Sequence, residues 1–283
     1  SKSMGLAMIG FADYFSELSP DLIVVLGDRY ETLAISIAAM NQRIPIAHLH
    51  GGEATEGLID ESVRHSITKM SYLHFTSTED YRKRVIQLGE NPSRVFNVGS
   101  VGVENIKNIS YLSKKELSEA IGLSLDKPYA VVTYHPVTLE NESSEEQVSE
   151  LLDAISQLDD MNFIFTKANS DADGRIINAM IDEYVQKHSN CIAVASLGLK
   201  KYLSAVLYCS MVIGNSSSGI IEVPSFKVPT INIGDRQKGR IQATSIINCD
   251  PNSNSILKAI LEAKSYVFRD KIKKTQNPYE KEG

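Results

Sequence analysis

Short, wholly apolar segments alternate along the chain with longer segments in which apolar residues recur every three to four positions. The short segments have the length of strands, and the longer ones have the pattern of amphipathic helices. The predicted strands are 22–26, 44–48, 73–76, 95–98, 130–133, 163–165, 192–194, 211–213 and 230–233. The main predicted helices are 4–18, 30–40, 61–70, 79–88, 145–158, 173–188, 200–209 and 255–265. Apolar strands that alternate with helices indicate parallel sheets buried on both faces, so the pattern predicts an α/β fold.

A polar stretch at 108–127 interrupts this pattern, and the strands start again after Pro128. We therefore expect two Rossmann-like domains, 1–113 and 114–266, followed by a tail, 267–283, that leads back toward the first domain. A chain of 283 residues also favours two domains. The first helix feeds directly into a strand, and the tail stops without a helix-ending signal. We expect that the natural protein continues beyond both ends.

Composition excludes several classes of protein. The formal net charge is −6 and there is no basic block, which argues against nucleic acid and anionic membranes as partners. No apolar run approaches the roughly 20 residues that span a bilayer, and no secretory signal is visible. The three cysteines have no paired spacing, which argues against disulfides and zinc and favours a reducing cytoplasm.

Titratable residues gather where the predicted strands of the first half end. Asp28 follows the first strand and could simply cap the next helix. The second strand runs into His48-Leu49-His50-Gly51-Gly52-Glu53, which is richer in titratable groups than a turn requires. In open α/β sheets, ligands bind beyond the carboxyl ends of the strands. Asp28, His50 and Glu53 are therefore candidate site residues.

The helix that follows begins with two possible charge pairs. Asp60 and Arg64 are four residues apart, as are Glu61 and His65, so each pair can share one helix face. As surface ion pairs they would contribute less than about 1 kcal/mol. Because the helix begins just after the His/Gly/Glu loop, its acidic start can also face the same site. Both interpretations stay open.

Three predicted strands in the second half of the chain end in polar loops. His135 follows one strand and stands before Pro136, which biases it towards an extended backbone. Gly214-Asn215-Ser216-Ser217-Ser218-Gly219 links a strand to a helix, and backbone N–H groups at a helix start bind anions. Glu222 could accept hydrogen bonds from a ribose diol, while the cations around Arg236 suit a diphosphate. Simple capping and a solvated loop are the structural alternatives. Neither a G-x-G-x-x-G nor a P-loop motif is present.

Together these segments resemble the hydrolysing UDP-N-acetylglucosamine 2-epimerases of bacterial sialic acid synthesis. The matching runs are GDRYE, AHLHGGE, IDESVRHSITKMS, RVIQLGENPSRVFNVGS, HPVTLEN, GNSSSGIIEVPS and INIGDRQKGR. The resemblance implies a glycosyltransferase-B-like pair of Rossmann-type domains with parallel sheets facing a central cleft. The first strand of that family and its Arg-containing phosphate loop lie upstream of this sequence, and its last helices lie beyond the end.

The resemblance also implies roles for individual residues. It places the catalytic chemistry on Asp28, Glu53, Asp60, Arg64 and His135. It places binding of UDP and the substrate on Arg29, His50, Asn215, Ser216, Ser217, Ser218, Gly219, Glu222 and Arg236. Some relatives carry an HIEGGE version of the AHLHGGE run, with Glu where this chain has His50. That difference makes Glu53 the favoured carboxylate and leaves the role of His50 open.

The implied reaction removes the C2 proton while UDP leaves C1, and water then adds to the resulting glycal to give N-acetylmannosamine. Two carboxylates can exchange protons with C2 and with water. We expect Asp28 or Glu53 to serve C2, and Asp60 to orient Arg64. No cofactor and no metal are implied. The expected partner is a UDP-sugar, and we expect a homo-oligomer, either a dimer or a tetramer.

Four alternatives remain at this point. The same chemistry could act on a UDP- or GDP-linked 2,4-diacetamido-trideoxyhexose on the route to legionaminic acid. A non-hydrolysing epimerase would keep UDP on its product. A glycosyltransferase of the same fold would depend on an acceptor, and a UDP-sugar-binding protein would bind without turnover. The clustered carboxylates favour a 2-epimerase over the last two.

Overall fold

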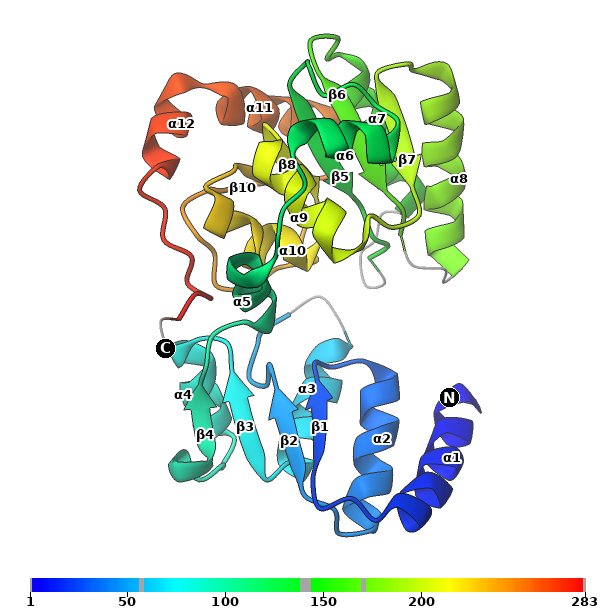
Figure 1. Cartoon of the computed structure of the whole chain (residues 1–283), viewed down its shortest axis with the longest axis vertical. Coiled ribbons are helices and arrows are strands. Elements are labelled where there is room, and N and C mark those ends of the chain that lie inside the picture. The colour runs from blue at the N-terminus through cyan, green and yellow to red at the C-terminus, as the bar shows by residue number, and fades with distance from the viewer. Residues whose placement is uncertain (1, 56–58, 138–143, 169–171, 282–283) are drawn as a thin grey trace. The chain divides into compact units, whose positions relative to one another are not determined.

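The computed structural model describes residues 2–55, 59–137, 144–168 and 172–281. The chain divides into two compact units (Figure 1). The N-terminal unit contains Ser1–Val101 and Tyr279–Gly283, and the C-terminal unit contains Gly102–Pro278. The boundary thus falls after the first residue of α5 (Val101–Asn108), whereas the sequence pattern placed it after residue 113. The reason is that the segment after α5 packs on the C-terminal unit, where the Leu112 N–H donates to Ser204 Oγ at 2.9 Å.

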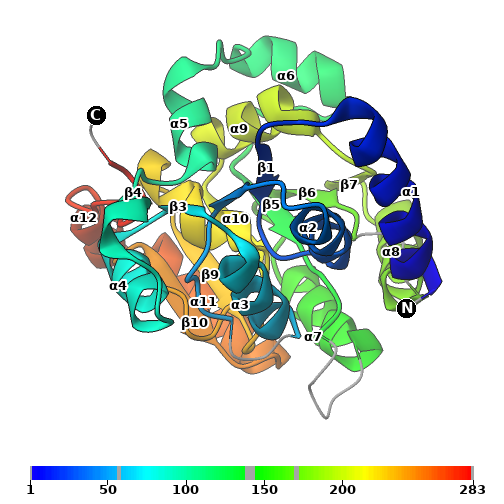
Figure 2. The ribbon, with the colours of Figure 1, turned by 90° about the horizontal axis from the view of Figure 1, so that it is seen from below.

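The N-terminal unit is a four-stranded parallel sheet in the order β1-β2-β3-β4. Its strands are β1 (Ile23–Leu26), β2 (Ile46–Leu49), β3 (Leu73–Thr76) and β4 (Val95–Asn97). Its helices are α1 (Lys2–Leu18), α2 (Tyr30–Asn41), α3 (Asp60–Met70), α4 (Glu79–Gln87) and a 3₁₀ turn at Pro92–Arg94. The strands are arranged in sequence order, and crossovers between parallel strands are right-handed. The connecting helices α2, α3 and α4 therefore cover one face of the sheet (Figure 2).

That arrangement leaves β1 buried on one side only. Val25 packs into a core with residues of α1, α2 and α3, and is 6% exposed. Val24 and Leu26 point to the opposite face and are 66% and 57% exposed. The sequence pattern predicted a strand buried on both faces, because an apolar run does not show which of its residues meet a helix.

The end of the described chain returns to the N-terminal unit. Tyr279 is fully buried there, with its hydroxyl 3.1 Å from the Tyr81 hydroxyl. The Ser100 N–H donates to the Tyr279 carbonyl at 2.9 Å, and Lys281 Nζ donates to the Asn97 carbonyl at 2.9 Å. Residues 279–281 therefore pack beside the carboxyl end of β4.

The C-terminal unit is a six-stranded parallel sheet in the order β10-β9-β8-β5-β6-β7. Its strands are β5 (Tyr129–Thr133), β6 (Asn162–Thr166), β7 (Cys191–Val194), β8 (Met211–Gly214), β9 (Thr230–Ile233) and β10 (Ile246–Cys249). Its helices after α5 are α6 (Lys114–Ile121), α7 (Ser144–Ser156), α8 (Ala172–Lys187), α9 (Gly198–Tyr208), α10 (Ser217–Ile221), α11 (Ser253–Lys264) and α12 (Tyr266–Ile272), with a 3₁₀ turn at Val223–Phe226.

Both faces of this sheet are covered, as the apolar strands predicted. Val132 packs with α7, α8 and α11 on one face, and Val131 packs with α6 and α9 on the other. Two α/β units with parallel sheets confirm the predicted fold class. The sequence pattern missed β10 and α12, because the first is a short strand of mixed polarity and the second has only seven residues.

The order of the strands reverses between β5 and β8. The chain runs outward from β5 through β6 to β7, and then returns to place β8 on the other side of β5. Such a reversal separates the loops at the carboxyl ends of the two central strands and opens a crevice for a ligand. The loops after β5 and β8 are therefore the expected ligand site of the C-terminal unit.

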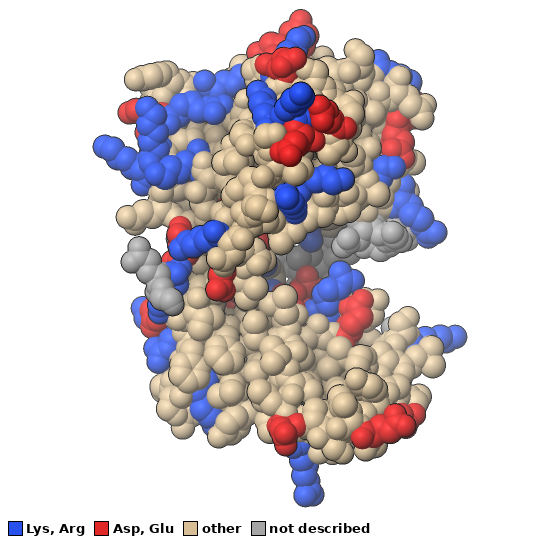
Figure 3. All heavy atoms as spheres, in the orientation of Figure 1, with Lys and Arg blue, Asp and Glu red and all other residues tan. Residues whose placement is uncertain are grey.

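The surface carries mixed charge. Figure 3 shows Lys and Arg side chains lying among Asp and Glu side chains on the visible face of both units. None of the described helices is both long and apolar enough to cross a membrane.

Candidate functional site

Arg64 is the centre of a charged network in the N-terminal unit. It lies on α3, and its side chain is only 1% exposed. Its guanidinium donates two hydrogen bonds to Asp28 Oδ2, one of them from Nε at 2.9 Å. It also donates to the Glu53 carbonyl, to Thr55 Oγ1 at 2.9 Å and to Glu61 Oε2 at 3.0 Å. A planar guanidinium suits so many acceptors because its donors form a rigid fork.

Glu61 is the second carboxylate that binds Arg64, after Asp28. The sequence pattern had paired Glu61 with His65 alone. Glu61 accepts hydrogen bonds from the Thr55 N–H at 2.7 Å and from Arg84 Nη2 at 2.8 Å, and its Oε1 lies 3.2 Å from His65 Nε2. Burial raises the pKa of Glu61, but the bonds from Thr55 and Arg84 and the charge of Arg64 outweigh burial, so that this pKa lies below its ordinary value. The spacing of three residues to Arg64 was the available signal.

His50 and Glu53 face each other in the loop after β2. His50 Nδ1 lies 3.1 Å from Glu53 Oε1, and Ser77 Oγ donates to the same oxygen at 2.9 Å. The Glu53 side chain is 3% exposed and that of His50 is 15% exposed. The backbone N–H of Val101 points at His50 Nε2, at 3.4 Å. Of the two side chains, His50 is the one that retains contact with solvent.

The Gly-Gly pair of this loop is required by close packing. At Gly52 φ is +78°, and a Cβ would lie 2.5 Å from the Tyr81 carbonyl oxygen. Beneath the loop, His48 is buried, with Nε2 2.8 Å from the Gly27 carbonyl and Nδ1 3.3 Å from Thr68 Oγ1. Burial lowers the pKa of His48 to about 4. This ring is therefore a neutral structural group, whereas His50 is the histidine of the site.

Asp60 and Arg29 lie at the more exposed margin. Asp60 is the first residue of α3 and is partly exposed. Arg29 is 64% exposed and forms an ion pair with Glu31 at 3.1 Å. That hydrogen bond raises the pKa of Arg29, and the charge of Asp60 adds to the effect. The orientation of Arg64 by Asp60 stays a prediction, since the described contacts of Arg64 include Asp28 and Glu61.

In the C-terminal unit, Asn215 joins the two loops at the strand reversal. Its buried side chain accepts from the His135 N–H at 2.7 Å and donates to the His135 carbonyl at 2.8 Å. Asn215 follows Gly214, where φ is +134° and a Cβ would lie 1.8 Å from the Thr133 carbonyl oxygen. Asn215 was predicted to bind UDP, and its side chain holds His135 in place. Of the HPVTLEN run, residues 138–141 lie outside the described residues.

The serine loop opens the short helix α10. Ser216 is its N-cap, with Oγ accepting from the Ser218 N–H at 3.4 Å, and Ser217 begins the helix. Ser218 Oγ lies 2.6 Å from the hydroxyl of Tyr202, a residue that sequence reasoning missed because it lies on α9. Gly219 lets α10 approach β9, since a Cβ there would lie 2.8 Å from Thr230 Cγ2.

Glu222 lies at the end of α10 rather than within a longer helix, because the chain passes directly into the 3₁₀ turn at Val223–Phe226. Its side chain is partly exposed and lies against α5, where a Cβ on Gly102 would come within 2.5 Å of Glu222 Oε1. The serine loop and Glu222 therefore stand at the two ends of one short helix. That spacing allows one ligand to contact both.

Arg236 follows β9 and is the last candidate site residue of the C-terminal unit. Its Nη1 donates to the Asn215 carbonyl at 3.0 Å, and Gln237 Nε2 donates to the same oxygen at 2.9 Å. The loops after β5, β8 and β9 thus meet at Asn215. The structure brings His135, the serine loop and Arg236 together at one edge of the sheet, as the strand-end argument predicted.

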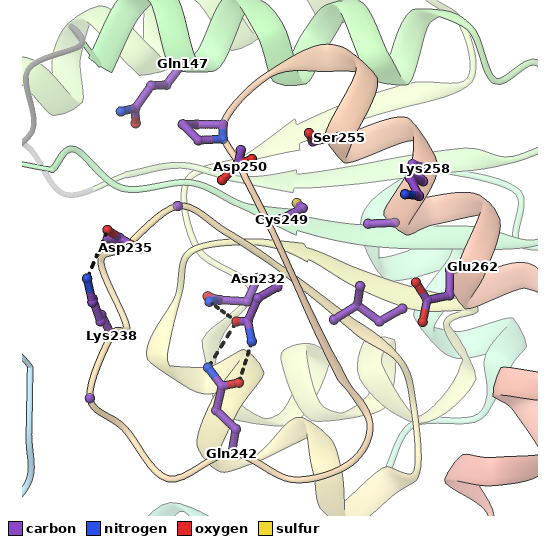
Figure 4. A pocket seen from close by; sticks show the side chains of 16 residues that line it. Gln147, Asn232, Asp235, Lys238, Gln242, Cys249, Asp250, Ser255, Lys258 and Glu262 are labelled. Carbon is purple, nitrogen blue, oxygen red and sulfur yellow. Dashed lines mark hydrogen bonds and ion pairs between the residues drawn. The ribbon is translucent and has the colours of Figure 1, made fainter.

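Beside this loop lies a pocket of about 760 Å³ between β9, β10 and α11. Three of its side-chain amides bind one another: Asn232 Nδ2 donates to Asn248 Oδ1 at 2.8 Å, and Asn248 Nδ2 donates to Gln242 Oε1 at 2.7 Å. Figure 4 shows Asn232 and Gln242 beside the loop that carries Asp235 and Lys238. The trio anchors the far end of the loop that begins with Arg236.

No group of three or more His, Cys, Asp or Glu side chains within the described ranges is arranged to hold a metal ion. The candidate residues of the two units offer carboxylates and an imidazole at Asp28, Glu53 and His50, guanidinium groups at Arg64 and Arg236, and hydrogen-bonding groups in the serine loop and at Glu222.

Comparison with known proteins identifies the family that this chain resembles. A family model described as UDP-N-acetylglucosamine 2-epimerase matches residues 1–283. A Campylobacter jejuni protein named GDP/UDP-N,N'-diacetylbacillosamine 2-epimerase (hydrolyzing) is 47% identical over 266 residues, which cover 94% of this chain and 69% of that protein. Polysialic acid biosynthesis protein P7 of Escherichia coli is 46% identical over 281 residues, covering 99% of this chain and 71% of that protein.

Among crystal structures, the UDP-GlcNAc 2-epimerase from Neisseria meningitidis bound to UDP-GlcNAc superimposes with a TM-score of 0.81. The match covers 98% of this chain and 77% of that one, at 17% identity. At this identity the likeness supports the fold alone.

Proposed function

The chain belongs to the UDP-N-acetylglucosamine 2-epimerase family, and from this premise we propose that it is a hydrolysing 2-epimerase. The proposed reaction converts UDP-N-acetylglucosamine and water to N-acetylmannosamine and UDP. The observation that carries the hydrolysing class is the 47% identity to a relative named as hydrolyzing, over 94% of this chain.

In this proposal the C-terminal unit holds the nucleotide. The serine loop 216–218 takes the diphosphate through its hydroxyl and N–H groups, and Glu222 accepts hydrogen bonds from the ribose. Arg236 and His135 stand beside that loop and neutralise charge on the leaving UDP. Their shared contact with Asn215 supports this arrangement, since His135 binds its buried side-chain amide and Arg236 binds its backbone carbonyl.

The N-terminal unit supplies the proton chemistry. In the elimination step, the C2–H bond breaks, its electron pair forms the C1–C2 double bond, and the C1–O pair leaves with UDP. Water then adds at C1 while a proton returns to C2 from the opposite face. Both described hydrogen bonds from Arg64 to Asp28 end on Oδ2, and we propose that Oδ1 accepts a proton or a hydrogen bond. Asp60 and Arg29 are proposed to line the same site.

The test is a coupled measurement of both products. Incubation with UDP-N-acetylglucosamine should release UDP and N-acetylmannosamine in equal amounts, and the sugar should carry one deuterium at C2 when the reaction runs in D₂O. A product that retains UDP would indicate a non-hydrolysing epimerase. Release of UDP only when an acceptor is added would indicate a glycosyltransferase.

A second substrate is favoured by one observation: the Campylobacter relative is named for diacetylbacillosamine. We propose it as the alternative substrate, because the same elimination and hydration act on any 2-acetamido sugar with UDP or GDP at C1. Parallel assays with UDP-N-acetylglucosamine and the 2,4-diacetamido sugar nucleotides decide between them. Turnover of the diacetamido substrate alone would replace the first proposal.

We also propose that the protein works in the cytoplasm as a homo-oligomer, either a dimer or a tetramer. Sedimentation equilibrium of the purified protein tests this state directly. A single species at the mass of one chain, 31.2 kDa, would refute it.

A further inference from the structure

The loop after β2 holds His50 and Glu53 side by side, with Nδ1 of His50 3.1 Å from Oε1 of Glu53. We propose that His50 is the base that takes the C2 proton, and that Glu53 is a positioning residue that orients the His50 ring. This inference rests on the proposed function. It reverses the roles that sequence reasoning favoured for these two residues.

The first step concerns Glu53. Its side chain is 3% exposed, and Oε1 meets both His50 Nδ1, at 3.1 Å, and the hydroxyl of Ser77, at 2.9 Å. An ionised carboxylate can only accept hydrogen bonds, so both neighbours donate to it. Glu53 therefore directs its charge into the loop, at His50 and Ser77.

The second step concerns the tautomer of His50. If Nδ1 donates to Glu53, the neutral ring carries its proton on Nδ1 and a lone pair on Nε2. The Val101 N–H, 3.4 Å from Nε2, is a donor and fits that lone pair, and at this length the bond is weak enough for the substrate to replace it. Glu53 thus holds the ring in the tautomer that a base requires, as the acid of a catalytic triad does for its histidine.

The third step concerns position. His50 directly follows β2 and Asp28 lies two residues after β1, and these strands pair in parallel, so both residues lie at the same carboxyl edge. His50 has φ of +67°, a left-handed conformation that non-glycine residues rarely adopt. Its side chain is 15% exposed, whereas Glu53 is nearly inaccessible. The loop thus presents the imidazole and buries the carboxylate.

In the reaction, His50 Nε2 accepts the C2 proton as the C2–H pair forms the C1–C2 double bond and UDP leaves with the C1–O pair. The resulting imidazolium is stabilised by the Glu53 carboxylate. Water then adds to C1, a second acid delivers a proton to C2 from the other face, and the water proton restores that acid. His50 returns its proton to solvent, which balances the release of UDP.

The test compares His50→Gln, His50→Glu and Glu53→Gln with the parent enzyme, and uses His188→Gln on the C-terminal unit as the matched control. His50→Gln should lose at least about 100-fold in kcat, the usual share of a general base, with little change in KM. His50→Glu should recover part of kcat, because a carboxylate at this position can also accept a proton. The His188→Gln variant should keep the parental kcat.

A second readout does not need turnover. In ¹⁵N NMR of the histidine side chains at pH 8, His50 should carry its proton on Nδ1, and Glu53→Gln should move it toward Nε2. A proton on Nε2 in the parent protein overturns the dyad, and so does parental kcat in His50→Gln. If the parent releases UDP from no sugar nucleotide, the proposed function fails, while the tautomer still decides whether Glu53 orients His50.

Discussion

Replacement of Arg64 by Met is the sharpest test of how the N-terminal site is held together. Arg64 is 1% exposed and makes five hydrogen bonds, three of them to the carboxylates of Asp28 and Glu61. Met fills much of the same volume without a charge. The substitution leaves two partly buried carboxylates without their shared cation, and the Glu53 carbonyl without its donor.

The expected cost is about 3–5 kcal/mol, the range for removal of one partner from a buried ion pair. The matched control is Arg84→Met, which removes a cation that binds the same Glu61 but is 36% exposed. Its cost should stay below about 1 kcal/mol because solvent screens the pair. The difference between the two variants shows how much of the lost stability is due to the burial of Arg64 rather than to the loss of one positive charge.

Urea unfolding followed by far-ultraviolet circular dichroism measures both variants, since the chain has no Trp to report by fluorescence. The two units can unfold in separate transitions, and only one transition should move in Arg64→Met. If Arg64→Met unfolds within about 1 kcal/mol of the parent, or if both variants cost the same, the view of Arg64 as a buried hub is wrong.

Three further predictions concern other parts of the molecule. His48 has a pKa near 6.5 in the unfolded state, and burial lowers its pKa in the folded state to about 4. The free energy of unfolding should therefore be highest above pH 6.5 and fall by about 3 kcal/mol as the pH drops to about 4. Urea unfolding at pH 7 and pH 5 should show this loss in the parent and not in His48→Gln. Gly214→Ala should prevent the C-terminal unit from folding, because its Cβ would lie 1.8 Å from a carbonyl oxygen. Gly198→Ala is the control, since φ is +62° there but the Cβ would meet open space, and it should cost only about 1–2 kcal/mol. Thermal unfolding measures both variants. Glu222→Ala should weaken UDP binding at least about tenfold by calorimetry through loss of a charged hydrogen bond, and an unchanged Kd would remove Glu222 from the nucleotide site.

The sequence alone determined the fold class and the chain positions of most candidate site residues. A short apolar run between amphipathic helices indicates a buried strand, and the bounds of β5, β6, β8 and β9 were predicted within one or two residues for this reason. Because parallel strands end at one edge of a sheet, the residues after them could be named without coordinates. Asp28, His135, the serine loop and Arg236 came from this reasoning, and the ordered motifs identified the family.

The tertiary structure decided how those residues share their hydrogen bonds. Spacing paired Asp60 with Arg64, but the folded chain brings Asp28 from 36 residues away and adds Glu61. Sequence ranked Glu53 above His50 because some relatives carry Glu at the position of His50, but packing buries Glu53 and leaves the imidazole partly exposed. Burial and partner choice depend on contacts between residues far apart in the chain, and a linear pattern of polar and apolar positions does not contain them.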